Sequence, residues 1–301
     1  MRYTRIKNLS FLCHRIQYHK GGIAILNTEE ITSRQNPYVS YVCKLSEKKH
    51  RDNEGRFRFD GVKLFREALR CGVDIEAVLL TQKTCEKLLR EIEESKYSFK
   101  VKLLSQSVFE KISEEKSPEG VICVAKHIDK FHKFAKIDNE GDCPELAEVK
   151  GQSLFVLESV RDPGNLGTVI RTAAAFGVDN LILSNDCADI YNPRTIRAAM
   201  GTLFHQRIIR VDDLPTVIRL MSAQGRRAYA ATLGKEAKLL GKAELEKLDF
   251  IVVGNEGHGL SDDVIASCDS RLLIPMMPDT ESLNAAVASS VCLWEQFGRT
   301  L

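Results

Sequence analysis

An apolar strand that runs into a helix through a polar turn is the feature of this sequence that most limits its fold. Residues 154–157 are all apolar, as in strands buried on both faces of a parallel sheet, and residues 162–165 are turn formers. A helix is expected to begin near Leu166 and to carry Arg171 in its first turns, where a cation opposes the helix dipole. Open α/β sheets bind ligands outside the carboxyl ends of their strands, so Asn165 and Arg171 are predicted to mark a site.

A second apolar strand, residues 250–253, ends in a turn rich in glycine, Gly254-Asn-Glu256-Gly-His-Gly259. Its spacing is neither the dinucleotide-binding G-x-G-x-x-G nor the phosphate-binding G-x-x-x-x-G-K-[ST], and the chain contains neither pattern. A nicotinamide oxidoreductase is therefore excluded. The glycines allow positive φ angles and close approach of the backbone to a flat ligand, with the Glu256 carboxylate among them.

A third strand, residues 272–274, ends at Pro275, and a loop follows it. Ser282 is a candidate cap for the next helix, residues 285–294, which consists mainly of small and apolar residues. With the strands and helices expected between residues 180 and 232, the pattern predicts a parallel sheet covered by helices on both faces.

These three segments resemble, in order and spacing, the three motifs of the SpoU/TrmH class of RNA methyltransferases in the SPOUT superfamily. The matching motifs are N-x-G-x-x-x-R-T at residues 165–172, G-N-E-G-x-G at residues 254–259, and I-P-M with S-L-N at residues 274–276 and 282–284. The resemblance is specific over residues 150–298 and weaker over residues 31–126. It implies methylation of a ribose 2'-hydroxyl with S-adenosylmethionine, a deep trefoil knot in the C-terminal domain, and a homodimer in which each active site includes residues of the partner subunit.

The resemblance also assigns residues to the site. The catalytic residues it implies are Asn165, Arg171, Glu256, Ser282 and Asn284. The cofactor-binding residues it implies are Thr232, Gly254, Gly259, Ile274 and Leu283. The family assigns activation of the ribose hydroxyl to the arginine that matches Arg171. A guanidinium is a poor base, so phosphate anchoring with stabilisation of the developing alkoxide is equally consistent, and the role of Arg171 stays open.

Strands and helices also alternate in residues 31–126, which predicts a smaller layered α/β domain. The resemblance implies a ribosomal-protein-like RNA-binding module there. Basic residues gather between residues 44 and 70, and either a solvated helix face or a phosphate-contacting surface would explain them. The candidate RNA contacts are Lys48, Lys49, Arg51 and Arg56.

Two segments fit neither domain. Residues 1–30 are basic, and we expect them to be a disordered extension that is either a targeting segment or a product of a misassigned start. Residues 127–150 are polar and are expected to form a linker, so that the methyltransferase domain would span residues 151–301.

Composition limits the location and the partners. The nine cysteines are scattered without a C-x-x-C pair, which predicts reduced thiols in the cytoplasm and neither a disulfide framework nor a metal site. No segment has the ~20 apolar residues of a membrane span, so no membrane partner is expected. The net charge of +2 does not by itself predict a nucleic-acid partner.

The RNA substrate is left open between two classes. The two-domain layout favours ribosomal RNA, and an enzyme of the same class that acts on tRNA is the alternative. A non-catalytic RNA-binding relative would be expected to lose Asn165, Arg171 or Glu256, and all three are present. Neither the target nucleotide nor the choice between a housekeeping role and protection from an antibiotic follows from the sequence.

Overall fold

The structure is a computed structural model that describes residues 30–115, 117–137, 144–234, 236–255, 257–277 and 282–300. The chain divides into two compact units, with the boundary after His127. Residues 1–29, which include nearly all of the expected N-terminal extension, lie outside the described residues.

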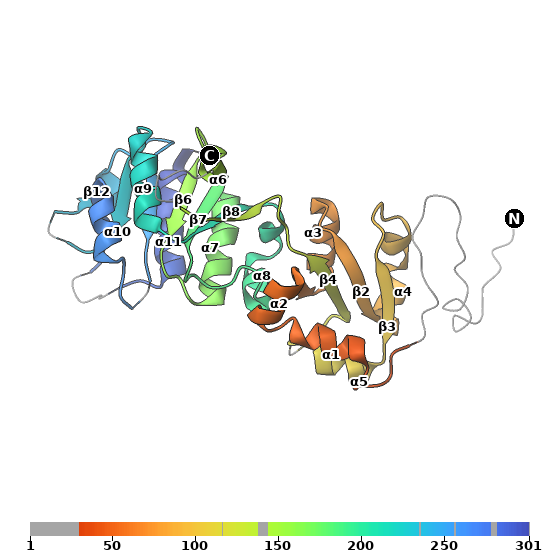
Figure 1. Ribbon diagram of the computed structural model, residues 1–301. Coiled ribbons are helices and arrows are strands. Elements are labelled where there is room, and N and C mark those ends of the chain that lie inside the picture. Colours follow the sequence, from red (N-terminus) through yellow and green to blue (C-terminus); the bar gives the residue numbers. More distant parts are fainter. Residues whose placement is uncertain are drawn as a thin grey trace, which may run out of the picture. The chain divides into compact units, whose positions relative to one another are not determined.

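The N-terminal unit holds a four-stranded sheet of order β1-β4-β2-β3 (Figure 1). Strand β4 is antiparallel to β1 and β2, and β2 is parallel to β3. Its helices and strands are α1 (Pro37–Lys44), α2 (Lys48–Glu54), β1 (Arg56–Asp60), α3 (Val62–Cys71), β2 (Ile75–Thr81), α4 (Gln82–Glu93), β3 (Lys100–Leu104), α5 (Gln106–Ile112) and β4 (Val121–Lys126).

Both faces of this sheet are covered, as a layered α/β domain requires. Ala77 and Leu79 of β2 belong to a core cluster with apolar residues of α1 and α5. Val78 and Leu80, which point to the opposite face, are also buried; α4 contacts β2 and β3, and α3 contacts β1 and β4. The smaller α/β domain expected from the sequence is therefore present.

The C-terminal unit is built on an eight-stranded sheet of order β10-β12-β9-β11-β6-β7-β8-β5, in which every neighbouring pair is parallel. This confirms the predicted parallel sheet. Its helices and strands are β5 (His132–Ala135), α6 (Pro144–Ala147), β6 (Leu154–Leu157), α7 (Pro163–Ala175), β7 (Asn180–Ser184), α8 (Pro193–Ala199), η2 (Thr202–Phe204), β8 (Arg207–Val211), α9 (Leu214–Ala223), β9 (Ala228–Ala231), β10 (Lys238–Leu239), η3 (Leu240–Lys242), β11 (Phe250–Val253), α10 (Asp262–Ser267), β12 (Ser270–Leu273), α11 (Ala285–Gln296) and η4 (Gly298–Thr300).

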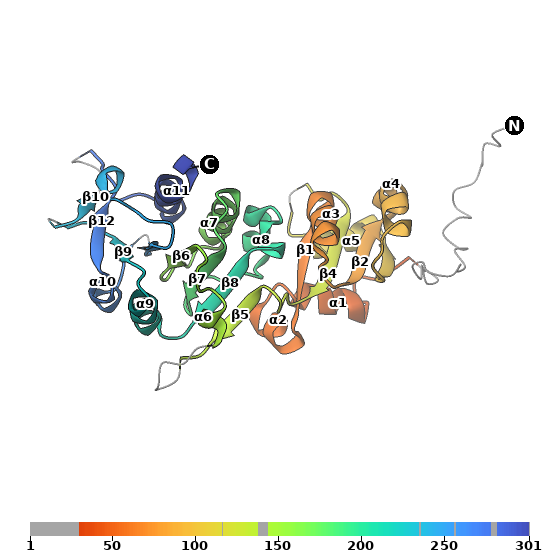
Figure 2. The same ribbon diagram turned by 90° about the horizontal axis from the view of Figure 1, so that it is seen from above.

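Helices cover the two faces of this sheet in separate groups. Figure 2 shows α7, α8 and α11 on one face and α6, α9 and α10 on the other. Gly167 lets α7 approach α8 closely, because a Cβ at that position would lie 2.3 Å from the carbonyl oxygen of Thr195. The glycine of the first motif therefore serves helix packing, and it fixes the position of the helix that carries Asn165 and Arg171.

The predicted linker at residues 127–150 is wrong over most of its length. Strand β5 pairs with β8 from His132 to Ala135, and Leu146 and Val149 are buried in the core of the C-terminal unit. The pairing of β5 joins His132 to Ile208 and Ala135 to Val211, which are far apart in the sequence, so the local polarity of the segment did not reveal it. The C-terminal unit therefore begins at Ile128, before the predicted residue 151.

None of the helices within the described residues is both long enough and apolar enough to cross a bilayer.

Candidate active site

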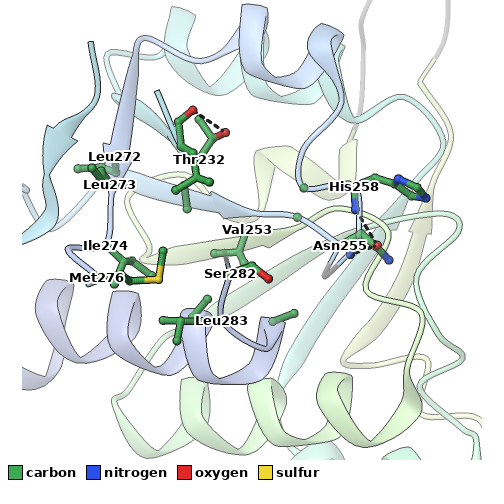
Figure 3. A pocket seen from close by; sticks show the side chains of 17 residues that line it. Thr232, Val253, Asn255, His258, Leu272, Leu273, Ile274, Met276, Ser282 and Leu283 are labelled. Carbon is green, nitrogen blue, oxygen red and sulfur yellow. Dashed lines mark hydrogen bonds between the residues drawn. The ribbon is translucent and has the colours of Figure 1, made fainter. Parts of the chain in front are cut away.

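A pocket of about 400 Å³ lies outside the carboxyl ends of β9, β11 and β12, which are neighbours in the sheet. Figure 3 shows Ile274 and Met276 at one edge, Asn255 and His258 at the opposite edge, and Leu283 along the wall. Small-molecule sites commonly have volumes of ~300 to 1,000 Å³ and mainly apolar walls with few polar groups. The position and the size of the pocket therefore suit a bound cofactor.

The residues predicted to bind the cofactor all line this pocket. They are Thr232, Gly254, Gly259, Ile274 and Leu283. Ser282, predicted to be catalytic, lines it as well and is exposed. Thr232 and Ile274 directly follow β9 and β12, the glycine turn after β11 supplies Gly254 and Gly259, and Ser282 and Leu283 precede α11. Segments far apart in the sequence therefore meet at one edge of the sheet.

The glycine-rich turn is compact because its two ends pair with each other. Asn255 and Gly259 exchange backbone N–H···O hydrogen bonds of 3.1 and 2.9 Å, and Gly259 has a φ of +67°. A Cβ on Gly254 would lie 2.4 Å from the carbonyl carbon and oxygen of Gly259, so only glycine fits there. Glu256, predicted to be catalytic, lies outside the described residues.

The first and third motifs meet through two asparagines. The side-chain N–H of Asn284 donates to Oδ1 of Asn165 over 3.1 Å. The Oδ1 of Asn284 accepts from the backbone N–H groups of Ala286 and Val287, so Asn284 is the N-cap of α11. The prediction that Ser282 caps this helix is therefore wrong, because the helix begins two residues later than that cap would require.

Two matches to known families cover the two units. Residues 152–294 match the model described as the SpoU rRNA Methylase family, and residues 36–123 match the MRM3-like substrate binding domain. An uncharacterized tRNA/rRNA methyltransferase of Synechocystis is 31% identical over 269 residues, which cover 88% of this chain and 92% of that relative. The chain belongs to the SpoU methylase family.

Two further proteins are similar to this chain over nearly their whole length. The 23S rRNA (guanosine(2553)-2'-O)-methyltransferase RlmP of Bacillus subtilis is 29% identical over 270 residues, which cover 90% of this chain and 100% of RlmP. The crystal structure of an AdoMet-bound rRNA methyltransferase from Sinorhizobium meliloti has a TM-score of 0.74 and 28% identity, and covers 91% of this chain and 99% of that one.

The SpoU-family arginine, Arg171, does not lie where the sequence predicted. Helix α7 begins at Pro163, with Asp162 as its N-cap, so Arg171 lies past the middle of the helix and outside its first turns. Arg171 is six positions after Asn165, which places the two side chains about 120° apart around the helix. Arg171 is exposed, and within the described residues its guanidinium makes no ion pair. Within the part of the chain that the structure describes, this cation is therefore available to an anionic ligand.

The structure separates the four candidate RNA contacts of the N-terminal unit. Arg51 is 1% exposed and donates to the carbonyl oxygen of Leu45 over 2.8 Å, so the prediction that it contacts RNA is wrong. The charge of Arg56 is balanced by a bidentate ion pair with Glu76, and that of Lys48 by Asp52. Lys49 is exposed and has no ion pair within the described residues.

Sequence reasoning missed the part played by Asn255 and did not single out Ser159 or Asp186. The side chain of Asn255 donates to the carbonyl oxygen of Ser159 over 2.9 Å and accepts from the N–H of Gly257 over 2.8 Å. An asparagine at the start of a turn is a known signal for such side-chain to backbone bonding, and it was available in the sequence. Nothing in the residue types indicated the bonds of Ser159.

Proposed function

We propose that this chain is an S-adenosylmethionine-dependent RNA methyltransferase that methylates a ribose 2'-hydroxyl, with ribosomal RNA as its substrate. The observation that carries the proposal is the pocket at the strand ends, closed by the glycine turn and adjoining α11, whose N-cap Asn284 is bonded to Asn165. The names of RlmP and of the Sinorhizobium protein support ribosomal RNA as the substrate and S-adenosylmethionine as the cofactor.

The pocket residues fit this cofactor. Ile274 and Leu283 offer apolar side chains for the adenine, and the backbone amides around Gly254 are available to its polar edge. The cofactor supplies an electrophilic methyl group on a positively charged sulfur. We propose no metal ion for the reaction, because the sulfonium already provides the activation that a Lewis acid would otherwise give.

Methyl transfer would form a bond from the 2'-oxygen to the methyl carbon and break the carbon–sulfur bond of the cofactor, with the hydroxyl proton released to solvent water. The main task of the protein is alignment, which can lower the barrier by ~7 to 11 kcal/mol in favourable cases. We assign Asn165 and Asn284 to positioning the ribose through their amides. Arg171 anchors the phosphate of the target nucleotide and stabilises the negative charge that develops on the 2'-oxygen.

The substrate class is tested with purified protein, radiolabelled S-adenosylmethionine, and separate pools of unmodified ribosomal RNA and unmodified tRNA. Label in the ribosomal RNA pool alone is expected. Label in the tRNA pool alone would replace this substrate with the alternative class, in keeping with the tRNA/rRNA name of the Synechocystis relative. Cofactor binding without label in either pool would favour a non-catalytic RNA-binding role.

We also propose the homodimer and the knot of the family. Helix α11 exposes Val287, Val291 and Trp294 on one stripe, with exposed fractions of 48%, 37% and 52%, and a second copy would cover them. The separation of Asn165 and Arg171 around α7 supports a site completed by the partner. Contacts of α11 with β11 and η3 are compatible with a C-terminal chain threaded through the loop that joins β9 to β11. Sedimentation at equilibrium tests the dimer, and a monomer at micromolar concentration would contradict it.

We propose a cytoplasmic location, supported by the burial of Cys123, Cys187 and Cys292 as thiols. Fractionation of cells that express the full chain tests this location, and recovery in an organelle or membrane fraction would contradict it.

A further inference from the structure

Ser159 is held in a backbone conformation that a serine rarely adopts. Its φ is +54°, in the left-handed region, which disfavours residues that carry a Cβ. The residue follows β6, and β6 lies between β11 and β7 in the sheet. Ser159 is therefore placed between the glycine turn after β11 and the loop after β7.

Each polar group of Ser159 is bonded to one of these two neighbours. Its backbone N–H donates to Oγ of Ser184 over 2.8 Å, and its Oγ donates to Oδ2 of Asp186 over 2.5 Å. Its carbonyl oxygen accepts from Nδ2 of Asn255 over 2.9 Å. The bonds on the β7 side hold the backbone in the conformation that presents the carbonyl to Asn255.

Asp186 is the centre of the β7 side. Besides the hydroxyl of Ser159, it accepts from Oγ of Ser184 over 2.6 Å and from the guanidinium of Arg161 over 2.8 Å. Burial alone would raise the pKa of Asp186, but the hydrogen bonds from Ser159, Ser184 and Arg161 outweigh it and lower the pKa to about 2. The carboxylate is therefore an ionised acceptor at neutral pH.

Asn255 connects the Ser159 carbonyl to the pocket. It lines the pocket, and its Oδ1 accepts from the N–H of Gly257 while its backbone pairs with Gly259. A rotation of the Ser159 carbonyl would remove the acceptor that fixes the Asn255 side chain. The turn would then lose the side-chain bond that sets its shape at Gly257.

We propose that Ser159 and Asp186 are positioning residues of the cofactor pocket, which hold Asn255 and thereby the turn from Gly254 to Gly259 in its binding shape. The proposal rests on the proposed function, because it concerns the affinity for S-adenosylmethionine. The competing explanation is that these bonds only satisfy polar groups at the strand ends. The two explanations differ in what a glycine at position 159 does.

The test compares Ser159→Ala with Ser159→Gly by calorimetric titration with S-adenosylmethionine. Both variants lose the hydroxyl, but only glycine adopts a positive φ freely. Ser159→Ala is expected to bind S-adenosylmethionine about tenfold more weakly, as the loss of the Asn255 bonds to Ser159 and Gly257 predicts. Ser159→Gly is expected to stay within about twofold of the unsubstituted protein. Equal affinity of all three proteins, or glycine as weak as alanine, would overturn the proposal.

Asp186→Asn extends the test. It is expected to weaken binding in the unsubstituted protein and to have little effect when combined with Ser159→Gly, because glycine no longer needs the restraint. Asp213→Asn is the control, since Asp213 also accepts two hydrogen bonds, from Thr216, at the N-cap of α9. It should lower the melting temperature without changing the affinity. If the unsubstituted protein does not bind the cofactor, the proposed function fails and this proposal fails with it.

Discussion

Replacement of Gly254 by alanine should distort the glycine turn and weaken cofactor binding. The added Cβ would lie 2.4 Å from the carbonyl carbon and oxygen of Gly259 and 2.6 Å from the backbone nitrogen of Leu260. These contacts are all with backbone atoms, so relief requires the turn to move by roughly 1 Å to reach ordinary van der Waals contact. Overpacking of this kind typically costs ~1 to 3 kcal/mol.

The same strain, if expressed in the pocket, corresponds to a loss of affinity of about 5- to 150-fold, since each ~1.4 kcal/mol is a factor of ten. Calorimetric titration with S-adenosylmethionine measures this loss, and a thermal melt measures the part that appears as lower stability. Gly241→Ala is the matched control, because no atom lies within 4 Å of its added Cβ. A Gly254→Ala protein with unchanged affinity and melting temperature would refute the account of this turn.

Three further predictions concern other parts of the molecule. Asn284→Ala should destabilise the protein by ~0.5 to 2 kcal/mol, because the N-cap of α11 is lost. Asn284→Asp keeps the cap acceptor but loses the N–H that donates to Asn165, so it should retain stability and lose methyl transfer. Thermal melts and activity assays on both variants check this. The pKa of Asp186 is lowered from 3.8 to about 2, so its ionised form stabilises the fold above pH ~4, and this contribution is lost as the pH falls towards 2. Asp186→Asn should therefore flatten that part of the curve of unfolding free energy against pH, measured by denaturant titration. An unchanged curve would count against the hydrogen bonds assigned to Asp186. Lys49→Ala should weaken RNA binding and reduce the slope of log affinity against log salt by about one, because Lys49 is exposed. Arg51→Ala should instead lower stability, because Arg51 is buried. Filter binding at several salt concentrations and thermal melts of both variants separate the two effects.

Local pattern predicted much of the sheet. The apolar runs that form β6 and β11 were placed with their observed bounds, because a strand buried on both faces leaves a continuous hydrophobic signal. Helix α3 buries Leu64, Phe65 and Ala68, which recur with helical spacing, in keeping with the predicted alternation of strands and helices in this domain.

The elements that were missed lack such a signal. The one buried side chain of helix α2 is that of an arginine, Arg51, so its polar sequence has no apolar face to detect. Strand β5 has only four residues and owes its place to pairing with β8, a contact that no local window contains. Both errors reflect tertiary contacts that override local propensity.

The candidate site followed from the motifs more than from physical pattern. The turn residues indicated a ligand site at the strand ends, and the pocket lies there. The bond between Asn165 and Asn284 joins residues 119 positions apart, and only the family resemblance brought them together. The positive φ of Ser159 was not predictable, because serine seldom adopts that conformation and the bonds that hold it come from other strands.

Mass spectrometry of nucleosides from treated ribosomal RNA shows whether the protein transfers a methyl group to a ribose oxygen. Unmodified RNA is incubated with S-adenosylmethionine and either the unsubstituted protein or Arg171→Ala, then digested to nucleosides. We expect a 2'-O-methylated nucleoside with the unsubstituted protein and none with Arg171→Ala, although that variant still binds the cofactor. Methylation of a base, or equal ribose methylation by Arg171→Ala, would contradict it.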